Sequence, residues 1–196
     1  GSISYLSRTY GWQLQDTPGN DTYLFGYGSG RDTIFDYDTM PGNIDTILLH
    51  NGIAPSDVTL RRSGDGLRLR LDGSEDEIRV VNWFTDESGS YQVEHIQFAD
   101  GTLWDAGTIK HIALQGTPGD DVLIGYSSAD VIRGLDGHDA LYGLDGDDTL
   151  DGGAGHDWLY GGEGDNAIYG EEGDDYIHGG EGGVNFLSGG DGNDTL

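Results

Sequence analysis

The 196-residue chain contains no cysteine, a single methionine and only four prolines, and it has no long apolar run. Without cysteine there are no disulfide bonds and no thiolate ligands for zinc. No segment approaches the roughly 20 apolar residues that a membrane-spanning helix needs, so we expect no membrane span. Positive charge is scarce too, because nine Lys and Arg oppose 36 Asp and Glu, for a net charge of -27. This balance disfavours nucleic acid and anionic membranes as partners.

Glycine is abundant, with 36 residues, and from Gly116 onward it opens a recurring unit of nine residues. The successive units read GTPGDDVLI, GYSSADVIR, GLDGHDALY, GLDGDDTLD, GGAGHDWLY, GGEGDNAIY, GEEGDDYIH, GGEGGVNFLS and GGDGNDTL. The consensus is G-x-x-G-x-D-x-U-x, in which U is aliphatic. The eighth unit is one residue too long, and the ninth is truncated. The aliphatic position is held by Leu123, Ile132, Leu141, Leu150, Leu159, Ile168, Ile177, Leu187 and Leu196.

A unit with one aliphatic position cannot bury that side chain alone, so neighbouring units must stack into a continuous core. The glycines provide tight turns, and the residues around U suffice for a short strand. We therefore predict an all-β fold, a parallel β-roll with two units per coil. Odd units form one sheet, even units form the other, and every U points inward. Residues eighteen apart then lie one coil apart, roughly 4.8 Å.

The same spacing stacks the acidic position of each unit over that of the unit two further on. Carboxylates this close repel each other unless a cation lies between them, and ligation by oxygen alone suits calcium. Zinc or copper stays open only for isolated positions such as His138 and His156, which lie eighteen residues apart. One edge of the roll stacks Asp121, Asp139, Asp157, Asp175 and Asp194, and the other stacks Asp130, Asp148, Asn166 and Asn185.

These units resemble the nonapeptide repeats, GGxGxDxUx, of the RTX (haemolysin-type calcium-binding) family. The resemblance implies several calcium ions between turns two units apart, held by the stacked side chains and by backbone carbonyls. Departures from the family pattern at Asn166, Asn185, Ser128 and the extra residue near Gly183 lead us to expect more ions on the edge that contains Asp121. The carbonyl ligands implied by the resemblance are those of Gly119, Gly134, Asp136, Gly137, Gly146, Gly152, Ala154, Gly155, Gly164, Gly170, Glu172 and Gly173.

Charge predicts what happens to the repeats without calcium. From residue 117 onward, 19 Asp and Glu face the single Arg133, with little apolar area to offset their repulsion. We therefore expect a disordered chain that folds when calcium binds. The resemblance further implies secretion, with the repeats unfolded in the low calcium of the cytosol. Because the last unit is truncated, we expect a piece of a longer protein. The resemblance implies that this protein is bacterial and secreted or at the cell surface, by a route that needs no signal peptide at the start of the chain.

The N-terminal part, residues 1–115, departs from the nine-residue register, and residues 116–196 form the predicted roll. Looser copies of the repeat place Asp21, Asp32 and Asp45 at the acidic position, and calcium there stays open. Alternating runs between residues 53 and 109, with LRLRL the clearest, predict an antiparallel meander with one solvated face. DVTLRRSGDGLRLRL, NWF and FADGTLW are similar to the haemolysin-type calcium-binding-related domain. We expect this β-rich part to cap the first coil of the roll.

The remaining question is whether any residue serves a purpose other than calcium binding. The outward positions Tyr142, Trp158, Tyr160 and Tyr176 form a predicted aromatic patch. It is either a cross-strand ladder or packing surface that stabilises the fold, or a platform for a glycan or protein partner. No nucleophile elbow, zinc-protease helix or phosphate loop is present, so we expect no enzyme active site in this segment. The alternative to calcium-triggered folding is thus an extracellular adhesion or glycan-binding module with calcium as scaffold.

Overall fold

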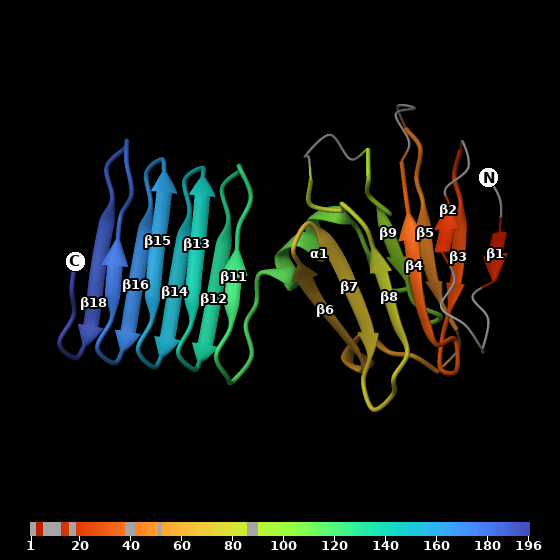
Figure 1. The fold of residues 1–196 in the computed structure, drawn as a ribbon, viewed down its shortest axis with the longest axis horizontal. Coiled ribbons are helices and arrows are strands. Elements are labelled where there is room, and N and C mark those ends of the chain that lie inside the picture. Colours follow the sequence, from red (N-terminus) through yellow and green to blue (C-terminus); the bar gives the residue numbers. More distant parts are fainter. Residues whose placement is uncertain (1–2, 6–12, 16–18, 38–41, 51, 86–89) are drawn as a thin grey trace. The chain divides into compact units, whose positions relative to one another are not determined.

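The computed structural model describes residues 3–5, 13–15, 19–37, 42–50, 52–85 and 90–196. Tyr10 and Trp12 lie outside the described residues. The chain divides into two compact units, Gly1–Ala113 and Leu114–Leu196, whose elements are drawn in Figure 1. Among the described residues, no helix has the length and apolar character needed to cross a membrane.

The unit Leu114–Leu196 is a parallel β-roll, which confirms the prediction from the nine-residue register. Odd repeat units form one sheet and even units form the other (Figure 1). The first sheet consists of β11 (Val122–Ile124), β13 (Ala140–Asp145), β15 (Trp158–Glu163) and β17 (Tyr176–His178). The second consists of β12 (Val131–Asp136), β14 (Thr149–Ala154), β16 (Ala167–Glu172) and β18 (Phe186–Asp191).

The aliphatic positions of successive coils lie side by side in each sheet. Leu123 pairs with Leu141, and Leu141 pairs with Leu159, so each coil contains eighteen residues as predicted. From Leu123 to Ile177 these side chains are at most 5% exposed, and they fill the space between the sheets. One inward-facing aliphatic row per sheet is therefore the core of this unit.

The surplus residue of the eighth unit is absorbed in a turn. Ile168 pairs with Leu187, which is nineteen residues further on. The turn before β18 contains Gly182 and Gly183, whose φ angles of 79° and 62° lie in the left-handed region. Because glycine adopts this region without steric cost, the turn lengthens while the strand register is kept.

The N-terminal unit also contains two sheets, and it begins as an irregular version of the same roll. Parallel pairs run β1–β3–β5–β9 in one sheet and β2–β4–β8 in the other. The first sheet contains β1 (Ile3–Tyr5), β3 (Thr22–Phe25), β5 (Thr46–Leu49), β9 (His95–Gln97) and β10 (Leu103–Trp104). The second contains β2 (Gln13–Gln15), β4 (Arg31–Phe35), β8 (Glu77–Val80), β7 (Gly66–Leu71) and β6 (Val58–Ser63).

The predicted antiparallel meander is present as β6–β7–β8, but the next strand leaves it. Strand β9 pairs in parallel with β5 in the other sheet, and only then does β10 pair antiparallel with β9. The crossing is fixed by two buried hydrogen bonds, in which Nε1 of Trp83 donates to the carbonyl of Val93 and Nε2 of Gln92 donates to the carbonyl of Trp83. The sequence alternation alone does not specify which sheet a strand joins.

Two short helical elements were not predicted from the sequence. A 3-10 turn covers Pro55–Asp57, and α1 covers Ala106–Ala113. Helix α1 is stabilised at its start by Asp105, whose Oδ1 accepts a 2.8 Å hydrogen bond from the amide of Thr108. This is an N-cap interaction. The helix buries Ile109 and Ala113, and one short apolar stripe of this kind is too weak a pattern to indicate a helix.

Candidate metal centre

The acidic position of each repeat lies in the turn just before a strand, and its side chain forms a ladder along the edge of the roll. Oδ1 of each aspartate accepts a hydrogen bond from the backbone amide of the acidic residue one coil earlier. On one edge the amides of Asp121, Asp139, Asp157 and Asp175 donate to Asp139, Asp157, Asp175 and Asp194 over 2.8–3.0 Å. On the other edge the amides of Asp130, Asp148 and Asn166 donate to Asp148, Asn166 and Asn185 over 2.9 Å.

Four interior aspartates leave their second oxygen without a protein partner. These Oδ2 atoms are buried and accept no hydrogen bond, and they belong to Asp139, Asp148, Asp157 and Asp175. An unpaired buried carboxylate oxygen is costly, because it has lost its hydration without a replacement. A bound proton or cation would therefore stabilise each of these oxygens.

A backbone carbonyl oxygen lies near each of these unpaired Oδ2 atoms, which we call the orphan oxygens. A Cβ added to Gly134 would collide with both Oδ2 of Asp139 and the carbonyl oxygen of Gly152. An equivalent pair of oxygens lies beside Gly152, namely Oδ2 of Asp157 and the carbonyl oxygen of Gly170. The unit-opening glycines thus leave a small cradle that is lined by oxygen atoms and closed to any larger residue.

Burial also shifts the acidity of these carboxyls. Removal from solvent raises the pKa of Asp148 to about 7 and that of Asp157 to about 6, and the neighbouring carboxylates add to both shifts. The pKa values of Asp139 and Asp175 are raised for the same reasons. Hydrogen bonds from the backbone amides of the ladder oppose these shifts without cancelling them. A bound cation would instead stabilise the ionised carboxylates.

The first aspartate on each edge is satisfied by the protein itself. Oδ2 of Asp121 accepts hydrogen bonds from the amide and the hydroxyl of Thr117, at 2.5 and 2.8 Å. Oδ2 of Asp130 accepts one from the amide of Tyr126 at 2.5 Å. These two residues therefore lie in the ladder, as predicted, but need a cation less than the interior aspartates.

Asparagine changes the site on the even edge. Nδ2 of Asn166 donates a 3.3 Å hydrogen bond to the carbonyl of Gly179, so it presents a nitrogen where an aspartate presents Oδ2. Its neutral amide thus replaces a cation with a hydrogen bond. Among the predicted carbonyl ligands, those of Ala154 and Glu172 accept hydrogen bonds from the amides of Gly137 and Gly155. Each carbonyl keeps a second lone pair for a metal.

A second ladder runs beside the first, and only its two histidines were predicted from the sequence. It lies one position earlier in each unit, where a side-chain atom accepts the backbone amide of the next coil. On one edge it runs through Asp120, His138, His156, Asp174 and Asn193. On the other it runs through Asp147, Asp165 and Val184. The recurrence of Asp and His at this position of the repeat is the sequence signal from which this second ladder could have been predicted.

The irregular coils of the N-terminal unit repeat the ladder in part. Asp21, Asp32 and Asp45 are buried, and the amide of Asp21 donates to Oδ1 of Asp45 over 2.5 Å. The amide of Asp45 in turn donates to Oε2 of Glu94 over 2.6 Å. In the other sheet Asp76 accepts the amides of Gly28 and Gly30; burial pushes the pKa of Asp76 upward, but these hydrogen bonds hold it below its usual value.

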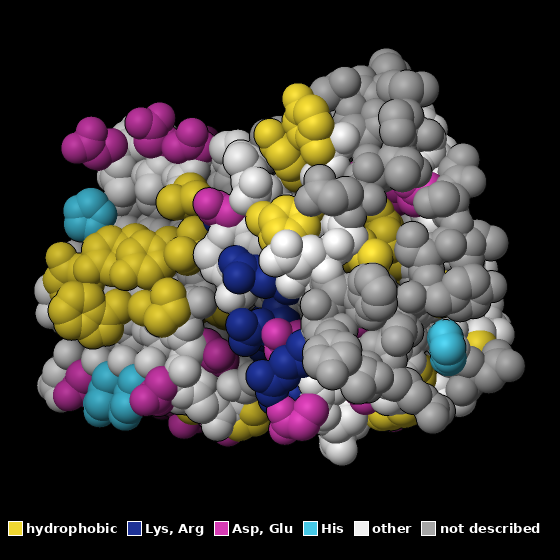
Figure 2. All heavy atoms as spheres, turned by 45° about the vertical axis from the view of Figure 1, so that its right-hand side comes forward, with side chains coloured by type: hydrophobic (Ala, Val, Ile, Leu, Met, Phe, Trp, Pro, Cys, Tyr) yellow, Lys and Arg dark blue, Asp and Glu magenta, His cyan; other side chains and the backbone are white. Residues whose placement is uncertain are grey.

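The predicted aromatic patch is present on the outer face of the odd sheet. The rings of Tyr142 and Tyr160 are stacked, with centroids 5.2 Å apart and planes 4° apart. Trp158 packs on Tyr176 at 5.3 Å, and its side chain is 56% exposed. Figure 2 shows hydrophobic side chains gathered on one face of this unit, with histidines nearby. The structure therefore brings all four predicted aromatics together.

In the part of the chain that the structure describes, no three His, Asp or Glu side chains converge on one point. A cation here would take carboxylate and carbonyl oxygens from successive coils, which is the ligand chemistry of calcium. Residues 115–150, 151–183 and 180–196 match the sequence profile of the RTX calcium-binding nonapeptide repeat. The roll is built of RTX calcium-binding repeats. Ahead of them, residues 67–108 match the haemolysin-type calcium binding protein related domain.

The chain is also similar to Iron-regulated protein FrpA of Neisseria meningitidis serogroup C. The two are 40% identical over 108 residues, which cover 55% of this chain and 10% of the relative. The chain therefore spans a small fraction of that protein's length. The repeat profile supports a calcium-binding module.

Proposed function

We propose that this chain is the calcium-triggered folding module of a larger secreted bacterial protein. In the low calcium of the cytosol the RTX repeats are unfolded and exportable, and they fold outside the cell when calcium binds. The observation that carries the proposal is the set of four buried Oδ2 atoms without a protein partner, on Asp139, Asp148, Asp157 and Asp175. Without a cation their ionised forms oppose folding of the roll.

The proposed ions lie at the cradles beside the unit-opening glycines, one for each interior aspartate. Each would be held by the orphan Oδ2 and by carbonyl oxygens of the adjacent turns, including those of Gly152 and Gly170. The carboxylates of Asp121, Asp130 and Asp194 lie at the ends of the ladders, and the amide oxygen of Asn166 continues the even ladder between Asp148 and Asn185.

The test is a far-UV circular dichroism titration of the whole chain with calcium after treatment with a chelator. We expect a coil-to-β transition with calcium and none at the same concentration of magnesium, which demands stricter octahedral geometry. Calorimetry on the same sample counts the ions. A chain that is already fully β-structured in chelator would contradict calcium-triggered folding.

The aromatic patch favours a second candidate function, an adhesion or glycan-binding module in which calcium is only the scaffold. A tryptophan that is 56% exposed beside stacked tyrosines is a suitable platform for a sugar ring or a partner protein. The double variant Trp158→Ala, Tyr160→Ala separates the two functions. Loss of binding on a glycan array, with calcium affinity unchanged, would support this candidate; unchanged binding would leave the patch as a stabilising ladder.

A further inference from the structure

More than half of the basic residues of this acidic chain lie on three adjacent strands of one sheet. Of nine Lys and Arg in the sequence, five lie on the three strands β6, β7 and β8. Figure 2 shows basic side chains gathered in a single cluster. The five are Arg61, Arg62, Arg68, Arg70 and Arg79.

Strand register places three of these arginines in one row. Arg61 lies opposite Arg68, and Arg68 lies opposite Arg79, so three like charges occupy directly facing positions on one side of the sheet. The next row along the same face contains Thr59, Arg70 and Glu77. The other face buries leucine, isoleucine and valine side chains of the core. Like charges that face each other across strands repel one another, so an anion bound at this row would be attracted by several guanidinium groups at once.

Carboxylates contact part of this arginine cluster. Nη2 of Arg62 lies 3.9 Å from Oδ1 of Asp65. Nε of Arg68 lies 3.4 Å from Oε1 of Glu77. Among the described residues, Arg70 and Arg79 form no salt bridge, and Arg70 donates instead to the carbonyl of Ser74 at 3.3 Å. Charge on an edge strand can serve to prevent aggregation, and this explains basic residues on the edge strand β6. It does not explain those on β7 and β8, which are paired on both sides.

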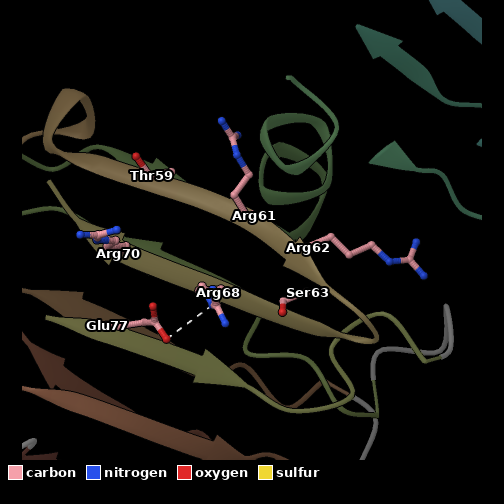
Figure 3. A pocket seen from close by; sticks show the side chains of 7 residues that line it. All are labelled: Thr59, Arg61, Arg62, Ser63, Arg68, Arg70 and Glu77. Carbon is pink, nitrogen blue, oxygen red and sulfur yellow. Dashed lines mark ion pairs between the residues drawn. The ribbon is translucent and has the colours of Figure 1, made fainter. Parts of the chain in front are cut away.

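The face contains a pocket of about 220 Å³ between β6, β7 and β8. Figure 3 shows Arg68 and Arg70 rising from β7 beside Glu77, while Arg61 and Arg62 extend from β6 in two different directions. No aromatic or aliphatic side chain lines the pocket, so it lacks a surface for a nucleobase or an apolar ligand. Its lining consists of Thr59, Arg61, Arg62, Ser63, Arg68, Arg70 and Glu77.

We propose that the basic face of β6, β7 and β8 is a binding site for a tetrahedral oxyanion, a phosphate or sulfate group, taken either as the free ion or as an ester. Guanidinium groups present forked N–H donors that match such oxygens, and the hydroxyl of Ser63 adds a further donor. The pocket is smaller than a typical site for a drug-sized ligand, which suits one such group. The acidic remainder of the chain repels extended polyanions, so the site selects a single compact group.

The test titrates the calcium-loaded whole chain with sodium sulfate and with glucose 6-phosphate by calorimetry, at constant ionic strength, with glucose as the uncharged counterpart. We expect saturable binding of at least one oxyanion and none of glucose. Binding of sulfate identifies the free ion as sufficient, and binding of glucose 6-phosphate alone identifies an ester. Failure of both oxyanions to bind, or capture of an oligo-aspartate peptide instead of them, would overturn the proposal.

Variants show whether the arginines carry the binding. Arg68→Ala combined with Arg70→Ala removes two exposed side chains and should weaken oxyanion binding by roughly tenfold or more. Arg31→Ala removes one positive charge from β4 in the same unit. It should change the affinity for the oxyanion less than about twofold, because the ion pair of Arg31 with Glu75 is exposed. Sulfate should raise the melting temperature of the unsubstituted chain but not of the double variant. If Arg31→Ala lost as much oxyanion affinity as the double variant, the binding would depend on overall charge, and the proposal of a specific site would be wrong.

Discussion

Nδ1 of His138 accepts a 2.8 Å hydrogen bond from the backbone amide of His156, and the two rings are parallel with centroids 5.1 Å apart. The amide of Asp174 donates to Nδ1 of His156 in the same way. Only the Nε2 atoms stay available to a metal, and parallel rings keep them about as far apart as the centroids. Two nitrogen ligands of one zinc, each at roughly 2.1 Å, cannot be that far apart. This pair is therefore a structural ladder and not a shared zinc site.

The histidine ladder predicts which substitutions the roll tolerates at position 138. His138→Leu removes the acceptor for the amide of His156 and should lower the free energy of unfolding by about 1 kcal/mol in calcium. His138→Asn keeps a neutral oxygen acceptor, as Asn185 does for the amide of Asn166, and should cost less. Thermal unfolding of both variants measures the difference. Equal stability of the two variants would contradict a role for the hydrogen bond.

The nine-residue register predicts most of the roll because one spacing determines three properties together. It places Leu141 beside Leu159, Asp139 over Asp157 and Tyr142 over Tyr160, and the structure contains all three relationships. In the N-terminal unit, LRLRL is indeed a strand, β7. Wherever the chain repeats a local pattern, the sequence is sufficient to predict the neighbours in space.

The sequence was insufficient where a contact depends on a turn or on strand order. Capping of Asp121 by Thr117 depends on a backbone amide whose direction is set by the first turn. The row of Arg61 and Arg68 follows from the antiparallel register of β6 and β7, which the length of the intervening turn determines. The passage of β9 to the other sheet depends on the buried contacts of Trp83. None of these contacts leaves a periodic signal in the chain.

Gly134 should be irreplaceable even by alanine. Its Cβ would collide with the carbonyl of Gly152, which the neighbouring coil holds in place, and with Oδ2 of Asp139. We expect Gly134→Ala to destabilise the calcium-loaded roll by about 3 kcal/mol or more. Gly119→Ala is the matched control, since no atom lies closer than 3.9 Å to its added Cβ. Calorimetric melting of both variants in calcium tests this, and a tolerated Gly134→Ala would show that the coils can separate.

Leu144 offers a route to a more stable roll. Its φ of 82° lies in the left-handed region, which costs a residue with a side chain about 1 kcal/mol or more. Other units place glycine at this position, for example Gly153 and Gly162. Leu144→Gly should therefore raise the melting temperature in calcium, whereas Leu144→Ala removes the same exposed side chain but keeps the strain. If the alanine variant gained as much stability, the benefit would come from side-chain removal and not from the backbone.

The raised pKa values predict opposite effects of acid on the metal-free and the calcium-loaded chain. Burial holds the pKa of Asp148 at about 7 and that of Asp157 at about 6 in the folded roll, above the ordinary value of 3.8. The folded state therefore binds protons more tightly than the unfolded state, so its stability falls as the pH rises through these values. In metal-free buffer we expect more β-structure near pH 5 than near pH 8 by circular dichroism. More β-structure at the higher pH would contradict this.

Calcium binding should show the reverse dependence on pH. Protons compete with calcium for the same carboxylates, so affinity should fall as the pH drops through the pKa of Asp148 and then that of Asp157. Between about pH 7.5 and pH 5.5 we expect a loss of roughly tenfold or more in calcium affinity, since one pKa unit of competition corresponds to a factor of ten. Calorimetric titration at the two pH values measures it. An affinity independent of pH would show that these two carboxyls do not hold the ions.

Asp157→Asn should convert a cation site into a neutral rung. Asn166 already shows this arrangement, with Oδ1 accepting the amide of Asp148 and Nδ2 donating to the carbonyl of Gly179. The variant should accept the amide of Asp139 in the same way and donate to the carbonyl of Gly170. We therefore expect fewer bound calcium ions by calorimetry, and also more residual structure in chelator, because one buried charge is gone.

The matched control for this substitution is Asp151→Asn on β14. The side chain of Asp151 is partly exposed and lies outside the acidic ladder, and its Oδ2 is 3.8 Å from Nε of Arg133. Asp151→Asn removes the same formal charge from the same roll but leaves the acidic ladder intact, so the number of bound calcium ions should not change. If both variants lost calcium equally, total charge and not the orphan oxygen of Asp157 would govern binding. If only Asp157→Asn lost calcium but its metal-free form gained no structure, the buried carboxylate would not be what keeps the empty roll unfolded.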